Sequence, residues 1–321
     1  MQVLGIDVAK LKFDVALLVA EGKFRSKAFE YTSSGFEALL AWLRRQAVDV
    51  SQLHACMEAT SSYSERLALW LHEAGAVVSV VNPLQIKAYG QSLLNRQKTD
   101  RADARLIALY CQAQRPTPWT PPPVSVRKLQ ALVARLEALQ QMRVAELNRQ
   151  SIADADVASS IGAVLATLDA EIKRIEKEIS DHIDANPDLK HKRELIESIP
   201  GIGPKVSMYF IAWFAGARRF ESVRQAVAFV GLSPRTHESG SSVRGKARIA
   251  KLGNARLRKI LYFPAISAMR FNPVIAAFAK QLRMRGKPNM TIIVAVMRKL
   301  VHFIYGVLRS DTPFTTRLAK P

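Results

Sequence analysis

The chain has 321 residues, of which 49% are hydrophobic and 23% are charged. These proportions exclude a wholly disordered chain, and the length allows two domains with a connector. No apolar run approaches the roughly 20 residues of a membrane span, and the first residues lack the regions of a signal peptide. The two cysteines, Cys56 and Cys111, have no metal-ligand spacing and predict no disulfide framework. We therefore expect a cytoplasmic protein without a membrane partner.

The formal net charge of +20 is concentrated toward the end of the chain. From Lys192 onward there are 24 Lys and Arg residues against 5 Asp and Glu, which leaves 23 bases and 22 acids before it. A nearly neutral first part followed by a strongly basic last part is typical of proteins that bind nucleic acids. The alternative is a solvated surface that only aids solubility.

The first third of the chain alternates strand and helix patterns. The first two predicted strands form a hairpin, and the later succession of strand, helix and strand predicts parallel pairing in an α/β sheet. A further helix is expected through 100–109, on the period of its apolar residues. The expected strands are Val3–Asp7, Phe13–Val19, Lys27–Tyr31, Leu53–Met57 and Val77–Val81, and the expected helices are Gly35–Ala47 and Ser64–Ala74.

Five prolines between Pro116 and Pro123 indicate a stiff domain boundary. After it, the sequence pattern changes from alternating strands and helices to mostly helices. Apolar residues at 3-4 spacing over 129–139 and 165–179 are typical of coiled-coil seams, each only about two heptads long. They predict an antiparallel helical hairpin, within one chain or shared between two, and favour self-association over ordinary helix packing. Further helices are expected at Glu194–Ser198, Lys205–Phe214, Val223–Val230, Leu257–Met269, Val274–Leu282 and Thr291–Leu308. The predicted domains are 1–123, 124–188 and 189–321.

Four acids in the first third form the first candidate site. Asp7 ends the first predicted strand, Glu58 ends a central one, and Asp100 and Asp103 lie on one face of a later helix. Strand-end and helix carboxylates in this order are what a ribonuclease-H-type sheet uses to hold two divalent ions, and Mg²⁺ suits such hard ligands. The alternative is that Asp100 caps the helix and Asp103 is a first-turn acid favoured by the helix dipole.

The segment Ile199-Pro200-Gly201-Ile202-Gly203-Pro204-Lys205 joins two predicted helices. It resembles a helix-hairpin-helix motif, which grips a DNA phosphate without reading sequence. Gly201 and Gly203 allow close backbone approach, and the N–H groups at the next helix start can bind an oxyanion beside Lys205. A plain helix–helix turn is the alternative.

The segment His237 to Arg248 combines three serines and two glycines with basic residues. A serine that attacks phosphorus needs neutralisation of the phosphate charge and an acceptor for its proton. Arg244, Lys246 and Arg248 supply positive charge for this purpose. The chemistry alone does not choose between Ser239, Ser241 and Ser242, nor does it exclude a phosphate-gripping loop without a covalent step. The polar, glycine-rich composition predicts disorder without substrate.

Six motifs in order resemble the DEDD transposases of the insertion-sequence family numbered one hundred and ten, over nearly the full length. They are Gly-Ile-Asp-Val-Ala-Lys (5–10), Glu-Ala-Thr (58–60), Lys-Thr-Asp-Arg-Ala-Asp-Ala-Arg (98–105), Ile-Pro-Gly-Ile-Gly (199–203), Phe-Val-Gly-Leu-Ser-Pro (229–234) and Glu-Ser-Gly-Ser-Ser-Val-Arg-Gly (238–245). One departure is Ser61, where the family usually has Gly after Glu-Ala-Thr.

The resemblance implies a fold and a division of roles. Residues 1–123 would form a RuvC-like, RNase H-type domain whose acidic tetrad, Asp7, Glu58, Asp100 and Asp103, binds Mg²⁺. Residues 124–188 would form a coiled-coil hairpin for assembly, and 189–321 a mostly helical transposase domain with the helix-hairpin-helix. Ser239, the first serine of its motif, would form a phosphoserine link to DNA.

The resemblance also implies partners. A bridge RNA that pairs with donor and target DNA would choose the sequences, and the protein would act as a homo-oligomer, a dimer assembling to a tetramer. The acids of one protomer would then serve the serine of another. Two other functions stay open: a RuvC-like metal-dependent endonuclease that cuts branched DNA without a covalent intermediate, and a non-catalytic nucleic-acid scaffold.

Overall fold

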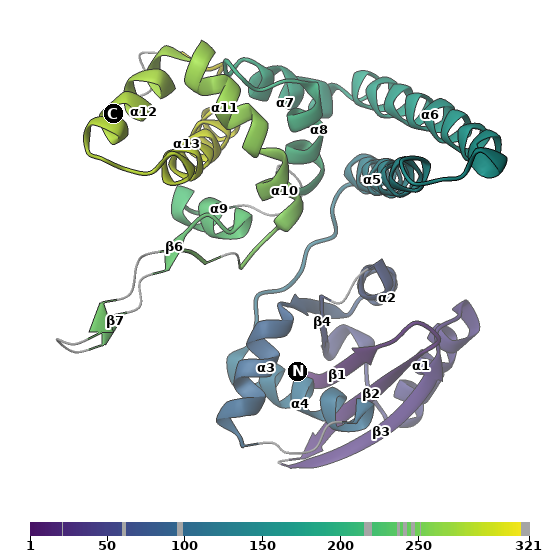
Figure 1. Cartoon of the computed structure of the whole chain (residues 1–321). Helices are drawn as coiled ribbons and strands as arrows, with labels where there is room; N and C mark the ends of the chain where they lie inside the picture. The colour runs from purple at the N-terminus through teal and green to yellow at the C-terminus, as the bar shows by residue number, and fades with distance from the viewer. Residues whose placement is uncertain are drawn as a thin grey trace. The chain divides into compact units, whose positions relative to one another are not determined.

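The computed structural model describes residues 1–20, 22–59, 62–94, 99–214, 220–235, 238–239, 243–244, 248–250 and 252–315. The chain divides into two compact units, Met1–Pro121 and Pro122–Pro321 (Figure 1). Each is described by itself below. The finer division into three domains at 1–123, 124–188 and 189–321 stays a prediction.

The N-terminal unit is built on a five-stranded sheet with the order β3-β2-β1-β4-β5. β1 pairs antiparallel with β2, which pairs antiparallel with β3, whereas β1 and β4, and β4 and β5, run parallel. This confirms the predicted mixed α/β class and the opening hairpin. The strands are β1 (Gln2–Val8), β2 (Lys12–Ala20), β3 (Lys23–Glu30), β4 (Leu53–Glu58) and β5 (Val77–Val81).

Four α-helices and a short 3-10 turn accompany the sheet. The main core of the unit gathers apolar side chains of the strands, α1 and α2, among them the stacked rings of Phe13 and Phe29. Helix α3 was not predicted, because a proline directly after a strand is also typical of a turn. Pro83 instead opens the helix, and the Asn82 side chain caps it by accepting from the Leu84 N–H at 2.9 Å. The helices are α1 (Ser33–Arg45), η1 (Val50–Gln52), α2 (Ser62–Glu73), α3 (Pro83–Ser92) and α4 (Asp100–Gln114).

α4 lies directly against β1, and Gly5 makes this approach possible. A Cβ atom at Gly5 would stand 2.1 Å from the Ala104 carbonyl oxygen and 2.4 Å from the Ala108 nitrogen. Alternate residues of a strand face the same side of a sheet, so Gly5 and Asp7 both face α4. The missing side chain at Gly5 therefore brings the first turn of α4 toward Asp7.

The C-terminal unit begins with a long helical hairpin made of α5 (Val124–Gln150) and α6 (Ala155–Asp184). The two helices pack against each other within one chain, and apolar residues of both seams belong to one core. Near the base of the hairpin, the His182 ring is within hydrogen-bonding distance, 2.8 Å, of the Ser125 carbonyl oxygen. The hairpin's apolar residues continue into the core of the helices that follow, so the unit has one connected core.

The remainder of this unit is mostly helical, as predicted. The expected helix over Leu257–Met269 is two helices, since the chain breaks at Leu261 between them. Among the described residues between α9 and α10, four two-residue strands are present. The elements are α7 (Pro187–Glu197), α8 (Pro204–Trp213), α9 (Val223–Val230), β6 (Pro234–Arg235), β7 (Glu238–Ser239), β8 (Val243–Arg244), β9 (Arg248–Ile249), α10 (Ala255–Ile260), α11 (Tyr262–Phe271), α12 (Pro273–Met284) and α13 (Asn289–Ser310).

It was also not predicted that α13 is as long and apolar as a membrane-spanning helix. Within the described part of the chain this helix is long and apolar enough to cross a membrane, and α10–α11 with α12 pass the same test as a bent pair. α13 nevertheless packs Val296, Leu300, Val301 and Ile304 into the core of its unit, where they are fully buried. Core packing accounts for its composition, and the expected cytoplasmic location stays a prediction.

The Gly5 contact yields a stability prediction. Gly5→Ala should destabilise the N-terminal unit by about 1–3 kcal/mol, because the added methyl group meets backbone that cannot move independently. Thermal and urea unfolding of the full chain measure this. Gly162→Ala, in α6 with open space around its Cβ position, is the control and should be neutral or stabilising by up to about 1 kcal/mol. Equal effects of the two variants would contradict the proposed role of Gly5.

Candidate functional site

Asp7 and Glu58 meet at the carboxyl edge of two parallel strands. β1 and β4 pair in a register that places Ile6 opposite Met57, so the next residues, Asp7 and Glu58, are neighbours. The first turn of α4 carries Asp100 and Asp103. Three elements that are far apart in the sequence thus bring the four predicted acids to one edge of the sheet.

The start of α4 corrects one interpretation. The helix is capped by Thr99, whose hydroxyl accepts from the Ala102 N–H at 3.2 Å, and not by Asp100. Asp100 and Asp103 both lie inside the first turn. Since Thr99 already provides the cap, neither carboxylate is needed for that purpose. The helix dipole still favours negative charge at both positions.

The surroundings of the cluster make ionisation of its acids less favourable. Burial, followed by the charges of Asp103, Asp100 and Asp14, raises the pKa of Asp7 to about 6, against a lowering by Lys12. Burial also raises the pKa of Glu58, with smaller contributions from Asp7 and Asp103. Burial is thus the larger cause of both shifts, and the charges of the neighbouring acids add to it.

Lys12 is a member of the cluster that sequence reasoning missed. Its ammonium group lies 2.8 Å from an Asp100 carboxylate oxygen and 3.0 Å from one of Asp14. The contact lowers the pKa of Asp100 and raises that of Lys12. The alternation of β2 was the available signal, because Lys12 and Asp14 share a face and Asp14 pairs directly with Asp7 in the hairpin.

The donor set suits a hard divalent cation, since all four predicted ligands are carboxylates. In the present arrangement, however, no three His, Cys, Asp or Glu side chains among the described residues stand so that they could hold a metal ion together. Asp100 is bound instead to the Lys12 ammonium. A positive charge therefore already sits beside the acids, supplied by the protein.

Ser239 lies in a small antiparallel hairpin. β6 pairs with β9, and β7 pairs with β8 in a register that places Ser239 opposite Val243. The backbones of Arg244 and Arg248 belong to β8 and β9. Their side chains and that of Ser239, together with Ser241, Ser242 and Lys246, lie outside the described residues, as does Lys98 of the tetrad motif.

The predicted phosphate-gripping turn joins α7 to α8. Gly201 has a φ of +98°, and a Cβ there would stand 2.8 Å from the Ala268 Cα atom in α11, so both its conformation and its surroundings require glycine. The Ser207 hydroxyl donates to the Glu197 carboxylate at 2.6 Å and ties the two helices together. α8 begins at Gly203 without a side-chain cap, and Lys205 follows on its exposed first turn.

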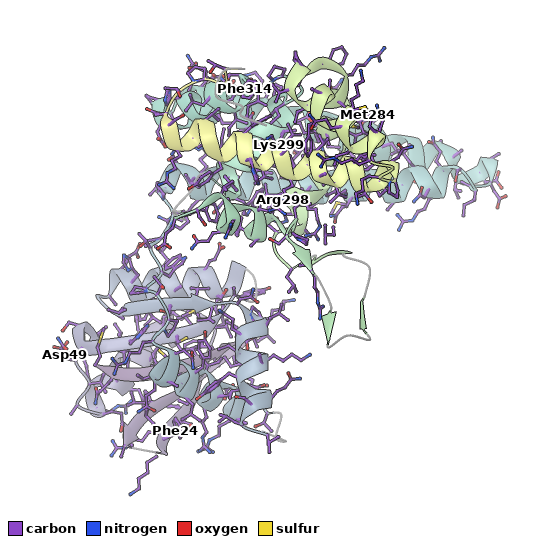
Figure 2. All side chains as sticks on the ribbon, turned by 90° about the vertical axis from the view of Figure 1, so that its left-hand side faces the viewer. Phe24, Asp49, Met284, Arg298, Lys299 and Phe314 are labelled. Atoms are coloured by element: carbon purple, nitrogen blue, oxygen red, sulfur yellow. The ribbon has the colours of Figure 1, made fainter. Side chains whose placement is uncertain are left out.

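The positive charge of this unit extends onto α13. Figure 2 shows Arg298 and Lys299 on this helix. Burial lowers the pKa of the neighbouring His302, and the positive charges of Arg298 and Lys299 lower it further. Three basic or titratable side chains on one helix thus share a region of positive potential.

Comparison with known proteins identifies the family. A transposase family model of the DEDD type matches residues 4–152, and the model described as "Transposase IS116/IS110/IS902 family" matches residues 193–280. The pilin gene-inverting protein of Moraxella bovis is 34% identical over 98% of each chain. The chain belongs to the IS116/IS110/IS902 family of transposases.

Other relatives agree with this assignment. The pilin gene-inverting protein of Moraxella lacunata is 33% identical over 98% of each chain, and the transposase for insertion sequence element IS1111A of Coxiella burnetii is 26% identical over 84% of this chain and 78% of its own.

The RuvC structure of Thermus thermophilus is 19% identical and covers 37% of this chain and all of its own, with a TM-score of 0.28, which does not establish the fold. As a transposase, the protein has DNA as its substrate.

The raised pKa of Asp7 predicts a pH-dependent stability of the transposase. The folded state binds the Asp7 proton more tightly than the unfolded state does, so stability falls as pH rises from about 4 through about 6. In the presence of a chelator, Asp7→Asn should therefore melt at a higher temperature than the wild type at pH 8, and the gain should shrink toward pH 4. Thermal melts across this range measure the difference.

Asp49→Asn is the matched control. Asp49 accepts from the Ser51 N–H at 2.9 Å, which lowers its pKa, so removing its charge should bring no gain at pH 8. An Asp7→Asn variant no more stable than the wild type at pH 8 would show that the acid cluster is not electrostatically strained.

Proposed function

We propose that this transposase cuts and rejoins DNA strands through a covalent link to Ser239, with a divalent cation, Mg²⁺, held by Asp7, Glu58, Asp100 and Asp103. The observation that carries the proposal is the meeting of these acids at one sheet edge, where burial and mutual repulsion raise the pKa of Asp7 to about 6. The strand order of the sheet supports a RuvC-like, RNase H-type fold for this unit.

The pKa of Asp7 supports cation binding at this edge, because protonation would neutralise its carboxylate only near or below pH 6. Lys12 is bound to Asp14 and Asp100. A bound Mg²⁺ would polarise phosphate oxygens and favour the ionised form of an attacking hydroxyl. The residues' own task is to keep the carboxylates together and ionised at neutral pH. Uptake of the ion by all four acids requires Asp100 to leave Lys12.

The serine step forms one bond and breaks one. The Ser239 hydroxyl oxygen would bond to phosphorus while the bond from phosphorus to one deoxyribose oxygen breaks. The serine proton leaves to a base or to solvent, and the departing sugar oxygen takes up a proton to become a hydroxyl. Strand exchange followed by the reverse reaction restores the serine and the phosphodiester. The basic residues Arg244, Lys246 and Arg248 flank Ser239 in the sequence and support this role by charge.

The family assignment supports a proposal for the partners as well. Donor and target DNA would be gripped along their backbones by the turn at Gly201 and Gly203 with Lys205, and a bridge RNA would choose the sequences. Exposed apolar residues at the end of the α5–α6 hairpin, including Ile152 and Val157, support association with a second copy, a dimer that assembles to a tetramer.

The serine step predicts a covalent intermediate. The wild type should yield a protein–DNA adduct that survives denaturation, and Ser239→Ala should abolish it while DNA affinity stays within about twofold. Denaturing gels with labelled DNA, followed by mass spectrometry of the adduct, measure both. Ser241→Ala and Ser242→Ala are the matched controls and should keep the adduct. Full recombination by Ser239→Ala would refute the serine mechanism, and free 5′-phosphate ends without any adduct would favour an endonuclease.

The acid cluster predicts a cation-dependent stability. At pH 8, Mg²⁺ should raise the melting temperature of the wild type but not that of Asp103→Asn, because the ion removes repulsion that exists only with the full set of carboxylates. Lys12→Ala should bind Mg²⁺ more tightly, since Asp100 is then released. Lys23→Ala, at the opposite end of the β2–β3 ladder, is the matched control and should behave as the wild type. Melting curves indifferent to both Mg²⁺ and a chelator would refute the cation site.

A further inference from the structure

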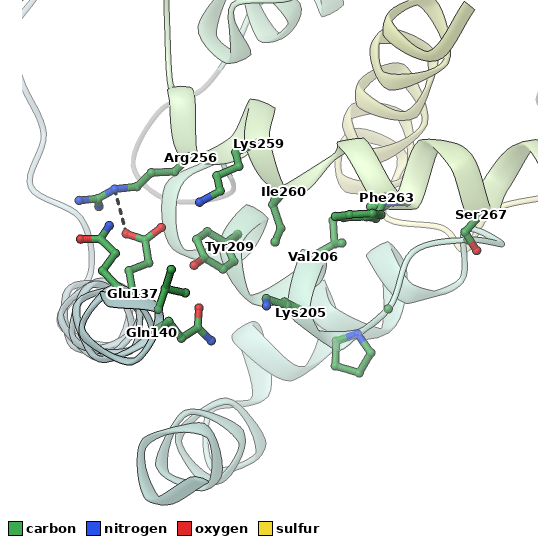
Figure 3. A pocket seen from close by; sticks show the side chains of 16 residues that line it. Glu137, Gln140, Lys205, Val206, Tyr209, Arg256, Lys259, Ile260, Phe263 and Ser267 are labelled. Carbon is green, nitrogen blue, oxygen red and sulfur yellow. Dashed lines mark ion pairs between the residues drawn. The ribbon is translucent and has the colours of Figure 1, made fainter. Parts of the chain in front are cut away.

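The C-terminal unit contains a cavity of about 750 Å³ beside the turn that carries Gly201 and Gly203. Helices α5, α8, α10 and α11 supply its walls (Figure 3). The proposed function uses only the turn and Lys205 at its rim. The cavity itself, which is within the size range of small-ligand sites, has no role in that function.

One wall of the cavity is apolar and carries an exposed aromatic ring. Val206 and Ile260 line it, and Phe263 is 77% exposed to solvent although it is a large apolar side chain. An exposed aromatic face at a cavity is suited to stacking against a flat ring. A nucleobase is such a ring.

Three cations stand around the same cavity. Arg256 is held in place by an ion pair with Glu137 at 3.1 Å and by the Trp213 ring, whose centroid lies 5.0 Å from its guanidinium carbon (Figure 3). Lys205 and Lys259 form no ion pair with any residue that the structure describes. Two uncompensated ammonium groups favour a ligand that carries negative charge, which excludes a purely apolar molecule.

Polar side chains complete the lining. Gln140 and Gln141 of α5 and Ser267 of α11 face the cavity. A glutamine amide offers both a donor and an acceptor, and this pair matches the hydrogen-bonding edge of a base. In a duplex that edge is paired and the base is stacked, so a base enters a cavity only when it is unpaired.

We propose that this cavity binds a single unpaired nucleotide of a nucleic-acid strand, with the base stacked on Phe263 and a phosphate beside Lys205 and Lys259. Inorganic phosphate alone would leave the aromatic wall unused, and a neutral ring would leave the cations unused. The inference rests on the proposed function only in requiring that the chain binds nucleic acid.

The test compares two duplexes that differ by one bulged nucleotide. The wild-type chain should bind the bulged duplex about tenfold more tightly than the perfect one, since stacking of one base on an aromatic side chain supplies a preference of this order. Phe263→Ala should remove the preference and leave affinity for the perfect duplex within about twofold. Lys259→Ala should reduce the preference for the bulged duplex. Fluorescence anisotropy measures each dissociation constant, and bulged strands made of DNA and of RNA distinguish the two sources of the nucleotide.

Two control variants keep the test specific. Phe271→Ala removes another exposed aromatic ring of α11 that does not line the cavity, and Lys280→Ala removes an exposed cation of α12. Both should retain the preference for the bulge. Equal binding of the two duplexes by the wild type, or a preference that survives Phe263→Ala, would overturn the cavity proposal and leave the proposed function standing. Failure to bind any nucleic acid would refute both.

Discussion

The burial of carboxylates side by side at the edge of the sheet is the constraint on which the N-terminal unit depends. Burial, and after it the charges of neighbouring acids, raise the pKa of Asp7 and of Glu58, so the surrounding packing must hold these ionised groups in place. The close contact of α4 with β1 at Gly5 does this, and the apolar core beneath the sheet stabilises the strands that bear the acids. Such stored unfavourable energy is typical of sites where stability is given up for function.

The location of the acids could be predicted from the sequence, whereas their contacts could not. Asp7 and Glu58 end strands that local alternation of apolar residues reveals, and the parallel register then makes them neighbours. The alternative that Asp100 caps α4 was wrong, because Thr99, the residue before it and also a good capping residue, is the N-cap. Only the backbone conformation distinguishes the two. The alternation of β2 places Lys12 on the face of Asp14 and Asp7, but its ion pair with Asp100 joins β2 to α4, and no local pattern predicts that contact.

The same distinction holds in the C-terminal unit. Heptad spacing predicted which faces of α5 and α6 are buried, but it did not say whether the partner helix belongs to the same chain. The structure pairs the seams within one chain and leaves the end of the hairpin, with Ile152 86% exposed, available to a second copy. The break at Leu261 escaped prediction because apolar residues continue through it at helical spacing.

The first and last parts of the sequence differ in net charge, and this difference bears on DNA binding. A phosphodiester approaching the acid edge meets repulsion, and Lys12 offers a single positive charge that two carboxylates already bind. Under the proposed function, attraction for the DNA backbone comes from the basic residues after Lys192, and the proposed cation neutralises the acid edge. An excess of 19 positive charges in the last part of the chain, beside near neutrality in the first, fits this division of tasks.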